Sequence, residues 1–199
     1  IIAASSFITS VTPMLPGTHK MSAVATFNDI ATADILCVPG GIGVTDVMND
    51  DAAMIWLRHV GKDAKWVTSV CTGSLILGAA GLLKGYKATS HWAWHDQLAL
   101  FGAEPVKART VFDRNRVTGG GVTAGIDFAL ALTSEIRGEA HARLVQLSLE
   151  YDPAPPFDSG SPGKVGKALL ATYAERMARL APNREVELKE AAAHLGFTG

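Results

Sequence analysis

Apolar and polar positions alternate along this 199-residue chain in a way that predicts short buried strands and amphipathic helices. Two apolar runs, residues 33–38 and 66–70, each end at a turn of small residues, which is typical of buried parallel strands. Apolar positions at helical spacing, with caps and glycine ends, predict the helices between them. The expected helices cover residues 52–60 (ended by Gly61), 75–83, 94–101, 123–136 and 139–150.

Two further strands are expected over residues 106–112 and 116–118, joined by a turn at residues 113–115. A further element is expected over residues 89–92. Strands that alternate with helices predict an α/β fold, a mostly parallel sheet with helices on both faces and right-handed crossovers. In such sheets ligands bind beyond the carboxyl ends of the strands.

The composition changes after residue 151. Residues 152–163 are rich in proline, glycine and serine, which predicts a surface connection, and amphipathic helices follow over 164–180 and 185–195. We therefore expect an α/β domain over residues 1–163. We also expect a helical extension over 164–199 that packs on the domain or on a partner subunit.

Composition and charge narrow the class of protein. Apolar residues make up 48% of the chain and the formal net charge is −1, without a basic stripe, which argues against nucleic-acid binding. No apolar run approaches the ~18 residues of a membrane span, and no signal peptide is evident. Two cysteines form no disulfide framework. The sequence thus predicts a cytoplasmic protein that binds a small molecule rather than nucleic acid or membranes.

Cys71 is the strongest candidate for chemistry. It ends the run 66–70, and Thr72-Gly73-Ser74 leads from it into a helix, which is the pattern of a nucleophile elbow. A helix N-terminus carries partial positive charge and favours the reactive thiolate. The alternative is a buried structural cysteine. Cys71 and the glycine turn 40–43 both follow strands, and this convergence at one sheet edge favours the reactive role.

The glycine turn that follows residues 33–38 could bring backbone N–H groups close to a reacting atom. Its glycines fit neither common nucleotide-binding pattern, so we interpret it as part of an oxyanion hole formed by the N–H groups of Gly41 and Thr72. A tight turn without chemistry is the alternative. One such donor can contribute about 3 kcal/mol to a transition state.

His91 is expected at the end of the element 89–92, where it could approach Cys71, or it could be a packing histidine. His91 and His95 lie four residues apart, but no further ligand cluster supports a metal site. Asp127 is expected to cap its helix or to form a structural pair, with a catalytic role as the alternative, and Cys37 is expected to be unreactive core.

These motifs together resemble the DJ-1/PfpI superfamily, and within it most closely the bacterial isocyanide hydratases. The resemblance extends over about residues 26–157. It rests on Val38-Pro39-Gly40-Gly41, Ser69-Val70-Cys71-Thr72-Gly73-Ser74, Ala88-Thr89-Ser90-His91-Trp92, Thr118-Gly119-Gly120-Gly121-Val122-Thr123-Ala124-Gly125-Ile126-Asp127, and Leu149-Glu150-Tyr151-Asp152-Pro153-Ala154-Pro155-Pro156-Phe157.

The resemblance implies a flavodoxin-like sandwich, a homodimer, and a cysteine nucleophile that works without a cofactor or metal. It implies that the thiolate attacks the terminal carbon of an isocyanide to give a thioimidate, which water converts to an N-substituted formamide. By the same resemblance Cys71, Thr72, Gly41 and His91 match catalytic positions. Gly40 and Val122 match residues of the substrate pocket.

The chain departs from the family pattern at its start. Relatives begin with a strand and helix that carry an acidic partner for the cysteine, whereas this sequence starts at Ile1 near the second strand. We therefore expect the first strand to be missing from this chain, the α/β domain to be truncated at its N-terminus, and an Asp or Glu to lie upstream.

Three other functions remain open from the sequence. The same fold serves as the ligand-sensing half of AraC-type regulators, although few residues follow Gly163 here. A glyoxalase-type hydratase would use the same thiolate on an aldehyde carbon. A redox sensor would use the oxidation of Cys71 itself.

Overall fold

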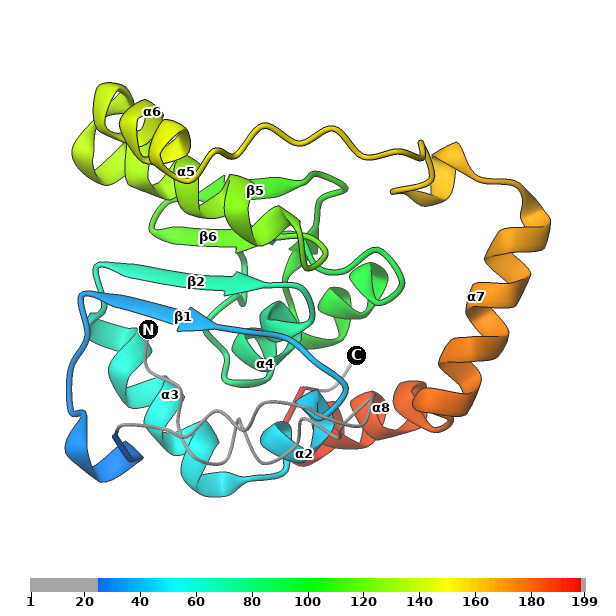
Figure 1. The fold of residues 1–199 in the computed structure, drawn as a ribbon. Helices are drawn as coiled ribbons and strands as arrows, with labels where there is room; N and C mark the ends of the chain where they lie inside the picture. The colour runs from blue at the N-terminus through cyan, green and yellow to red at the C-terminus, as the bar shows by residue number, and fades with distance from the viewer. Residues whose placement is uncertain (1–24, 198–199) are drawn as a thin grey trace.

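A four-stranded sheet forms the centre of the computed structural model, which describes residues 25–197 (Figure 1). The strand order is β1-β2-β6-β5. Strands β1 (Ile35–Val38), β2 (Trp66–Val70) and β6 (Arg116–Gly119) are parallel, and β5 (Thr110–Asp113) is antiparallel to β6. The mixed, mostly parallel sheet confirms the predicted α/β flavodoxin-like class. The expectation that the first strand is missing concerns a part of the chain that lies before residue 25, outside the described residues.

The pairing register brings the carboxyl ends of the parallel strands to one edge of the sheet. Val38 pairs with Ser69, and Val70 pairs with Gly119. Cys71, the turn after Val38 and the turn after Gly119 therefore meet at that edge. This is where ligands bind in open α/β sheets.

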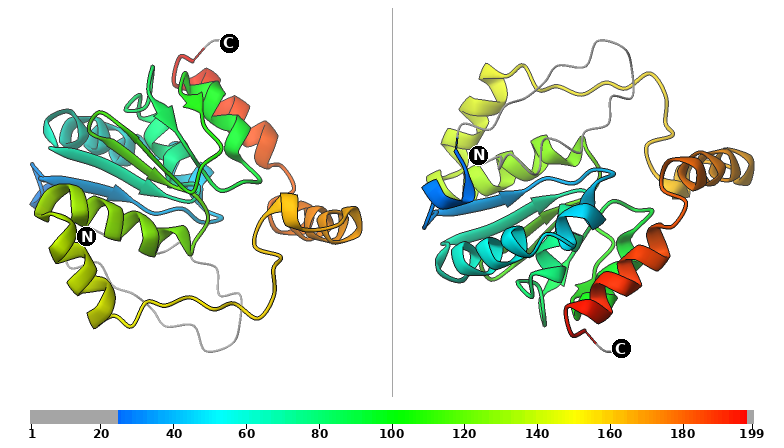
Figure 2. Two further views of the ribbon diagram at one scale, coloured as in Figure 1. Left: turned by 90° about the horizontal axis from the view of Figure 1, so that it is seen from above. Right: turned by 90° about the horizontal axis from the view of Figure 1, so that it is seen from below.

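Helices α2 (Val44–Met48), α3 (Asp51–Asp63) and α4 (Gly73–Ala79) lie on one side of the sheet. Helix α5 (Ala124–Arg137) covers the other face, and α6 (Glu139–Ser148) packs against α5. The two views of Figure 2 show these groups on opposite sides of the sheet. The larger core lies under the first group. The smaller one joins β6 to α5 through Val117, Phe128 and Leu132.

Gly61 does not end the helix as expected. Helix α3 starts at the predicted cap, where the Asp50 carboxylate accepts a bond from the Ala53 N–H at 3.1 Å, but it continues to Asp63. A Cβ on Gly61 would lie 2.5 Å from Cδ1 of Leu82. The glycine therefore serves close packing inside the helix rather than a C-terminal turn.

The segment between β2 and β6 is less regular than expected. Residues 89–92 do not form the expected element. The short strand β3 (Lys87–Ala88), which pairs with β4 (Glu104–Pro105), ends just before them. The expected helix over 94–101 is the 3₁₀ helix η2 (His95–Phe101), which ends at Gly102 in the left-handed conformation, with φ 71°. His91 therefore lies in a loop.

A long connection, which contains the short 3₁₀ turn η3 (Pro162–Lys164), leads from α6 to the two C-terminal helices. Another 3₁₀ turn, η1 (Phe27–Asp29), precedes β1. Helix α7 (Lys167–Leu180) lies at the periphery in Figure 1, and α8 (Arg184–His194) packs on α2 through the buried Leu188. Within residues 25–197, no helix is both long enough and apolar enough to cross a membrane.

Candidate active site

The turn between β2 and α4 holds Cys71 in a left-handed backbone conformation, with φ 60°. A residue other than glycine adopts this conformation at a cost of about 1–2 kcal/mol. Such strain is concentrated at functional sites, where the surrounding structure enforces it. The sharp strand-to-helix turn predicted from the sequence is therefore present, with Thr72 at the N-terminus of α4.

Hydrogen bonds from three segments hold the backbone of Cys71. Its N–H is shared between the carbonyl oxygens of Gly119 (3.0 Å) and Gly120 (2.7 Å). Its own carbonyl oxygen accepts bonds from the hydroxyls of Ser74 and Ser90, each at 3.1 Å. Sequence reasoning assigned no role to these two serines, although both lie within the quoted motifs. They position the elbow.

The Thr72 hydroxyl closes the glycine turn over the elbow. It accepts a bond from the Gly41 N–H at 3.0 Å and faces the Gly41 carbonyl at 3.2 Å, to which it can donate. A Cβ on Gly40 would lie 2.5 Å from the Thr72 nitrogen, so glycine is required for this approach. The expected role of Gly41 as an open N–H donor needs correction, because this N–H is bound to Thr72.

The environment of the Cys71 sulfur favours the neutral thiol. The side chain is half-buried, and burial raises the pKa of the thiol. Hydrogen bonds from the N–H and the hydroxyl of Thr72 oppose this rise but do not overcome it. Desolvation therefore opposes the preference for the thiolate that the helix N-terminus was expected to give. Within residues 25–197, no cluster of three His, Cys, Asp or Glu side chains could hold a metal ion.

His91 borders the site but does not pair with the thiol. Its Nδ1 accepts a bond from the Ala93 N–H at 3.3 Å, and burial lowers the pKa of the ring, so it is neutral with its proton on Nε2. The backbone of Gly121 lies against its edge.

The side chain of Val122, which was expected in the substrate pocket, is 79% exposed. Asp127, as expected, forms a structural pair: its carboxylate accepts bonds from Arg109 and, at 2.7 Å, from the Tyr151 hydroxyl. Cys37 lies in β1, beside the smaller core cluster under α5.

Tyr173 is a site residue that sequence reasoning missed. It reaches from α7 to stack on His91, with ring centroids 6.4 Å apart, and its ring packs at a tilt against Trp92, with centroids 4.7 Å apart. Burial raises the pKa of Tyr173, and the charge of a Cys71 thiolate raises it further. The sequence places Tyr173 on the apolar face of a C-terminal helix. The periodicity of that helix does not show which distant part of the protein the apolar face contacts.

The DJ-1/PfpI family model matches residues 5–135. The protein belongs to the DJ-1/PfpI family.

Among its relatives, the isonitrile hydratase of Pseudomonas putida is 51% identical over 178 residues, covering 89% of this chain and 78% of that protein. A crystal structure of a ThiJ/PfpI family protein from Pseudomonas syringae superimposes with a TM-score of 0.80 at 44% identity, covering 86% of this chain and 70% of that one. A deglycase of Thermococcus kodakarensis is 38% identical over 85 residues, 43% of this chain and 51% of that protein.

Proposed function

We propose that this protein hydrates isocyanides to N-substituted formamides, with Cys71 as the nucleophile. The observation that carries the proposal is the strained elbow, which holds a half-buried thiol at the carboxyl edge of the sheet. The similarity to an isonitrile hydratase over most of the chain supports this chemistry. Isonitrile and isocyanide name the same functional group.

The reaction balances as the addition of one water molecule. The Cys71 sulfur bonds to the terminal carbon of R–N≡C, and a proton equivalent to that of the thiol is placed on the same carbon, giving the thioimidate R–N=CH–S. Water then adds its oxygen to this carbon and one proton to nitrogen. The C–S bond breaks with its electron pair on sulfur, and R–NH–CHO leaves as the thiol is restored.

The residues around the sulfur have distinct tasks in this scheme. The N–H and hydroxyl of Thr72 stabilise the thiolate before attack and after the C–S bond breaks. Gly40 allows the turn to approach the elbow, and Gly41 positions the Thr72 hydroxyl. Neutral His91 borders the site and, with Gly40 and Val122, belongs to the proposed surroundings of the substrate.

The proposal extends to the assembly of the protein. Helix α6 and the residues after it present exposed apolar side chains, Leu144, Leu147 and Leu149, which suit a subunit interface. We propose a homodimer that works in the cytoplasm, where the two cysteines stay reduced.

The test measures which product forms. The protein is incubated with 4-nitrophenyl isocyanide and, separately, with methylglyoxal, and the products are followed by absorbance and proton NMR. Formation of N-(4-nitrophenyl)formamide supports the proposal. Turnover of methylglyoxal alone would replace it with a glyoxalase-type hydratase, and failure to turn over either compound would favour a sensor.

The pH dependence of this reaction is expected to follow the thiol. Because burial raises the pKa of Cys71 and only the thiolate attacks, activity should increase as the pH rises. Below the pKa, the thiolate fraction grows about tenfold per pH unit, so kcat/KM should rise by about 100-fold between pH 6 and 8. Initial rates across this range check the slope. A flat profile would contradict it and indicate that another group already ionises the thiol.

A further inference from the structure

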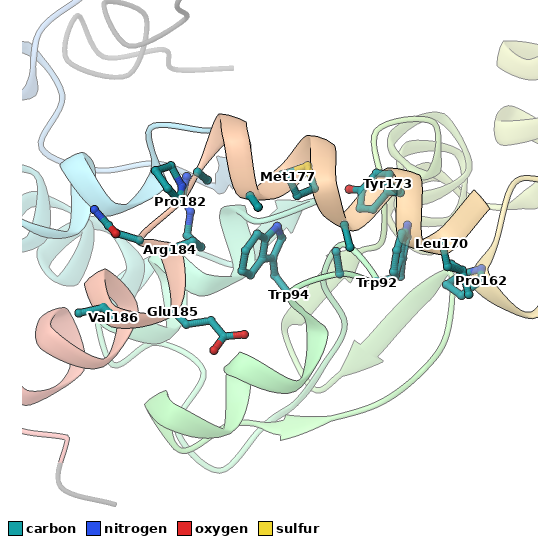
Figure 3. A pocket seen from close by; sticks show the side chains of 15 residues that line it. Trp92, Trp94, Pro162, Leu170, Tyr173, Met177, Pro182, Arg184, Glu185 and Val186 are labelled. Atoms are coloured by element: carbon teal, nitrogen blue, oxygen red, sulfur yellow. The ribbon is translucent and has the colours of Figure 1, made fainter. Parts of the chain in front are cut away.

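Arg184 is a buried cation at the start of α8, and the reaction scheme above gives it no task. Only 5% of the residue is exposed. It lies beside Trp94, and its guanidinium carbon is 5.9 Å from the centre of the Trp94 ring (Figure 3). Burying a charge is costly unless the charge is paired and hydrogen-bonded. The partners of this guanidinium therefore indicate what the residue does.

Those partners lie at the turn after β1 and at the start of α2. The guanidinium donates to the Ile42 carbonyl and, at 3.3 Å, to the Thr45 hydroxyl. The Thr45 hydroxyl donates in turn to the carboxylate of Glu187 at 2.9 Å. Burial lowers the pKa of Arg184, and the negative charges of Glu187 and Asp46 oppose this fall. The cation is thus paired within a closed network that joins α8 to the turn.

The same turn lies over the elbow. The Thr72 hydroxyl accepts a bond from the Gly41 N–H at 3.0 Å, which leaves its own proton for the Gly41 carbonyl or for the Cys71 sulfur. The position of Gly41 therefore governs where this hydroxyl points. Glycines give the turn little conformational preference of its own, so contacts from outside must hold it. The bond from Arg184 to the carbonyl of Ile42, the next residue, is such a contact.

We propose that Arg184 is a positioning residue, which fixes the glycine turn so that the Thr72 hydroxyl stays directed at the Cys71 sulfur. The inference rests on the proposed function, in which that sulfur is the nucleophile. It gives helix α8 a part in the chemistry through a continuous path of hydrogen bonds. Without the guanidinium the turn can shift, and small displacements of supporting groups can lower a rate substantially.

The reactivity of the thiol tests this role without any isocyanide. The protein and its variants are alkylated with iodoacetamide between about pH 6 and 10, and peptide mass spectrometry follows Cys71 separately from the other cysteine. Arg184→Met removes the charge and keeps a long side chain. Arg179→Met is the matched control, because Arg179 is exposed on α7. Circular dichroism compares the folds. Thr45→Val removes the hydroxyl that Arg184 binds, and it repeats the test if Arg184→Met misfolds.

We expect alkylation of Cys71 at pH 7 to be at least about threefold slower in Arg184→Met, because a displaced Thr72 no longer stabilises the thiolate. At high pH, where the thiol is fully ionised, the rate should stay within about twofold of the wild-type rate. Isocyanide hydration at pH 7 should fall about tenfold, mainly through kcat. Arg179→Met should match the wild type within about twofold in both measurements.

A purely structural role would give a different result. If Arg184 only holds α8 against α2, its loss lowers stability but leaves the pH profile of Cys71 alkylation unchanged. An unchanged or faster alkylation at pH 7 in both Arg184→Met and Thr45→Val would therefore overturn the positioning role. A wild type that hydrates no isocyanide would instead refute the proposed function, while the alkylation profiles would still decide the role of Arg184.

Discussion

Replacing Cys71 by alanine is expected to lower kcat/KM for isocyanide hydration by at least about 10³-fold. The proposed reaction needs a sulfur that forms and later breaks a bond to carbon, and no other group at the elbow can replace it. The fold should persist, because the alanine backbone can occupy the same conformation and the side chain is only half-buried. Formamide production and circular dichroism, measured on the same preparation, check both expectations.

Cys37 provides the matched control for this variant. It is the second free thiol, and it lies in β1 rather than at the elbow. Cys37→Ala should retain kcat/KM within about twofold and lose about 1 kcal/mol of stability. Equal loss of activity in the two variants would mean that the elbow thiol has no special role. Full activity in Cys71→Ala would refute the nucleophile directly.

Gly73→Ala is expected to damage both stability and activity. A Cβ on Gly73 would lie against the Val38 carbonyl oxygen and 2.8 Å from both the carbonyl carbon and oxygen of Pro39. These are backbone atoms at the end of β1, so no side-chain rotation relieves the clash. We expect a loss of about 3 kcal/mol in the free energy of unfolding. Because Gly73 adjoins Thr72, kcat/KM should also fall at least about tenfold.

Gly125→Ala isolates the effect of that close approach. Gly125 also lies in the first turn of a helix, α5, but a Cβ there would be 3.5 Å from Cγ1 of Val70, an ordinary packing distance. Alanine favours helix by about 1 kcal/mol over glycine, so this variant should be at least as stable as the wild type. Urea unfolding midpoints compare the two. Similar midpoints would show that the contact at Gly73 is not restrictive.

The elbow and the parallel strands were predictable because their signals are local. The run that ends at Cys71 is β-branched, the turn after it is built of small residues, and β2 has the predicted bounds of Trp66–Val70. Such a pattern predicts the strand and the turn, and it places the thiol at the edge of the sheet where the strands have their carboxyl ends.

Other parts of the site depend on contacts that the local pattern does not contain. Gly61 carries the signal of a helix end, yet packing against Leu82 keeps it inside α3. The pKa of Cys71 depends on burial by distant segments. Tyr173 joins the site only because the connection after α6 returns the chain to Trp92. These features follow from tertiary packing, which overrides local preference.

The bonds to the Cys71 N–H have a consequence for biosynthesis. The carbonyls that accept it belong to Gly119 and Gly120, almost fifty positions further along the chain. During translation, Cys71 therefore leaves the ribosome well before Gly119 and Gly120, whose carbonyls hold the turn, have been synthesised. During that interval the thiol belongs to a nascent segment, where an oxidant or electrophile can reach it without obstruction, and protection by the folded protein begins only after β6 has emerged.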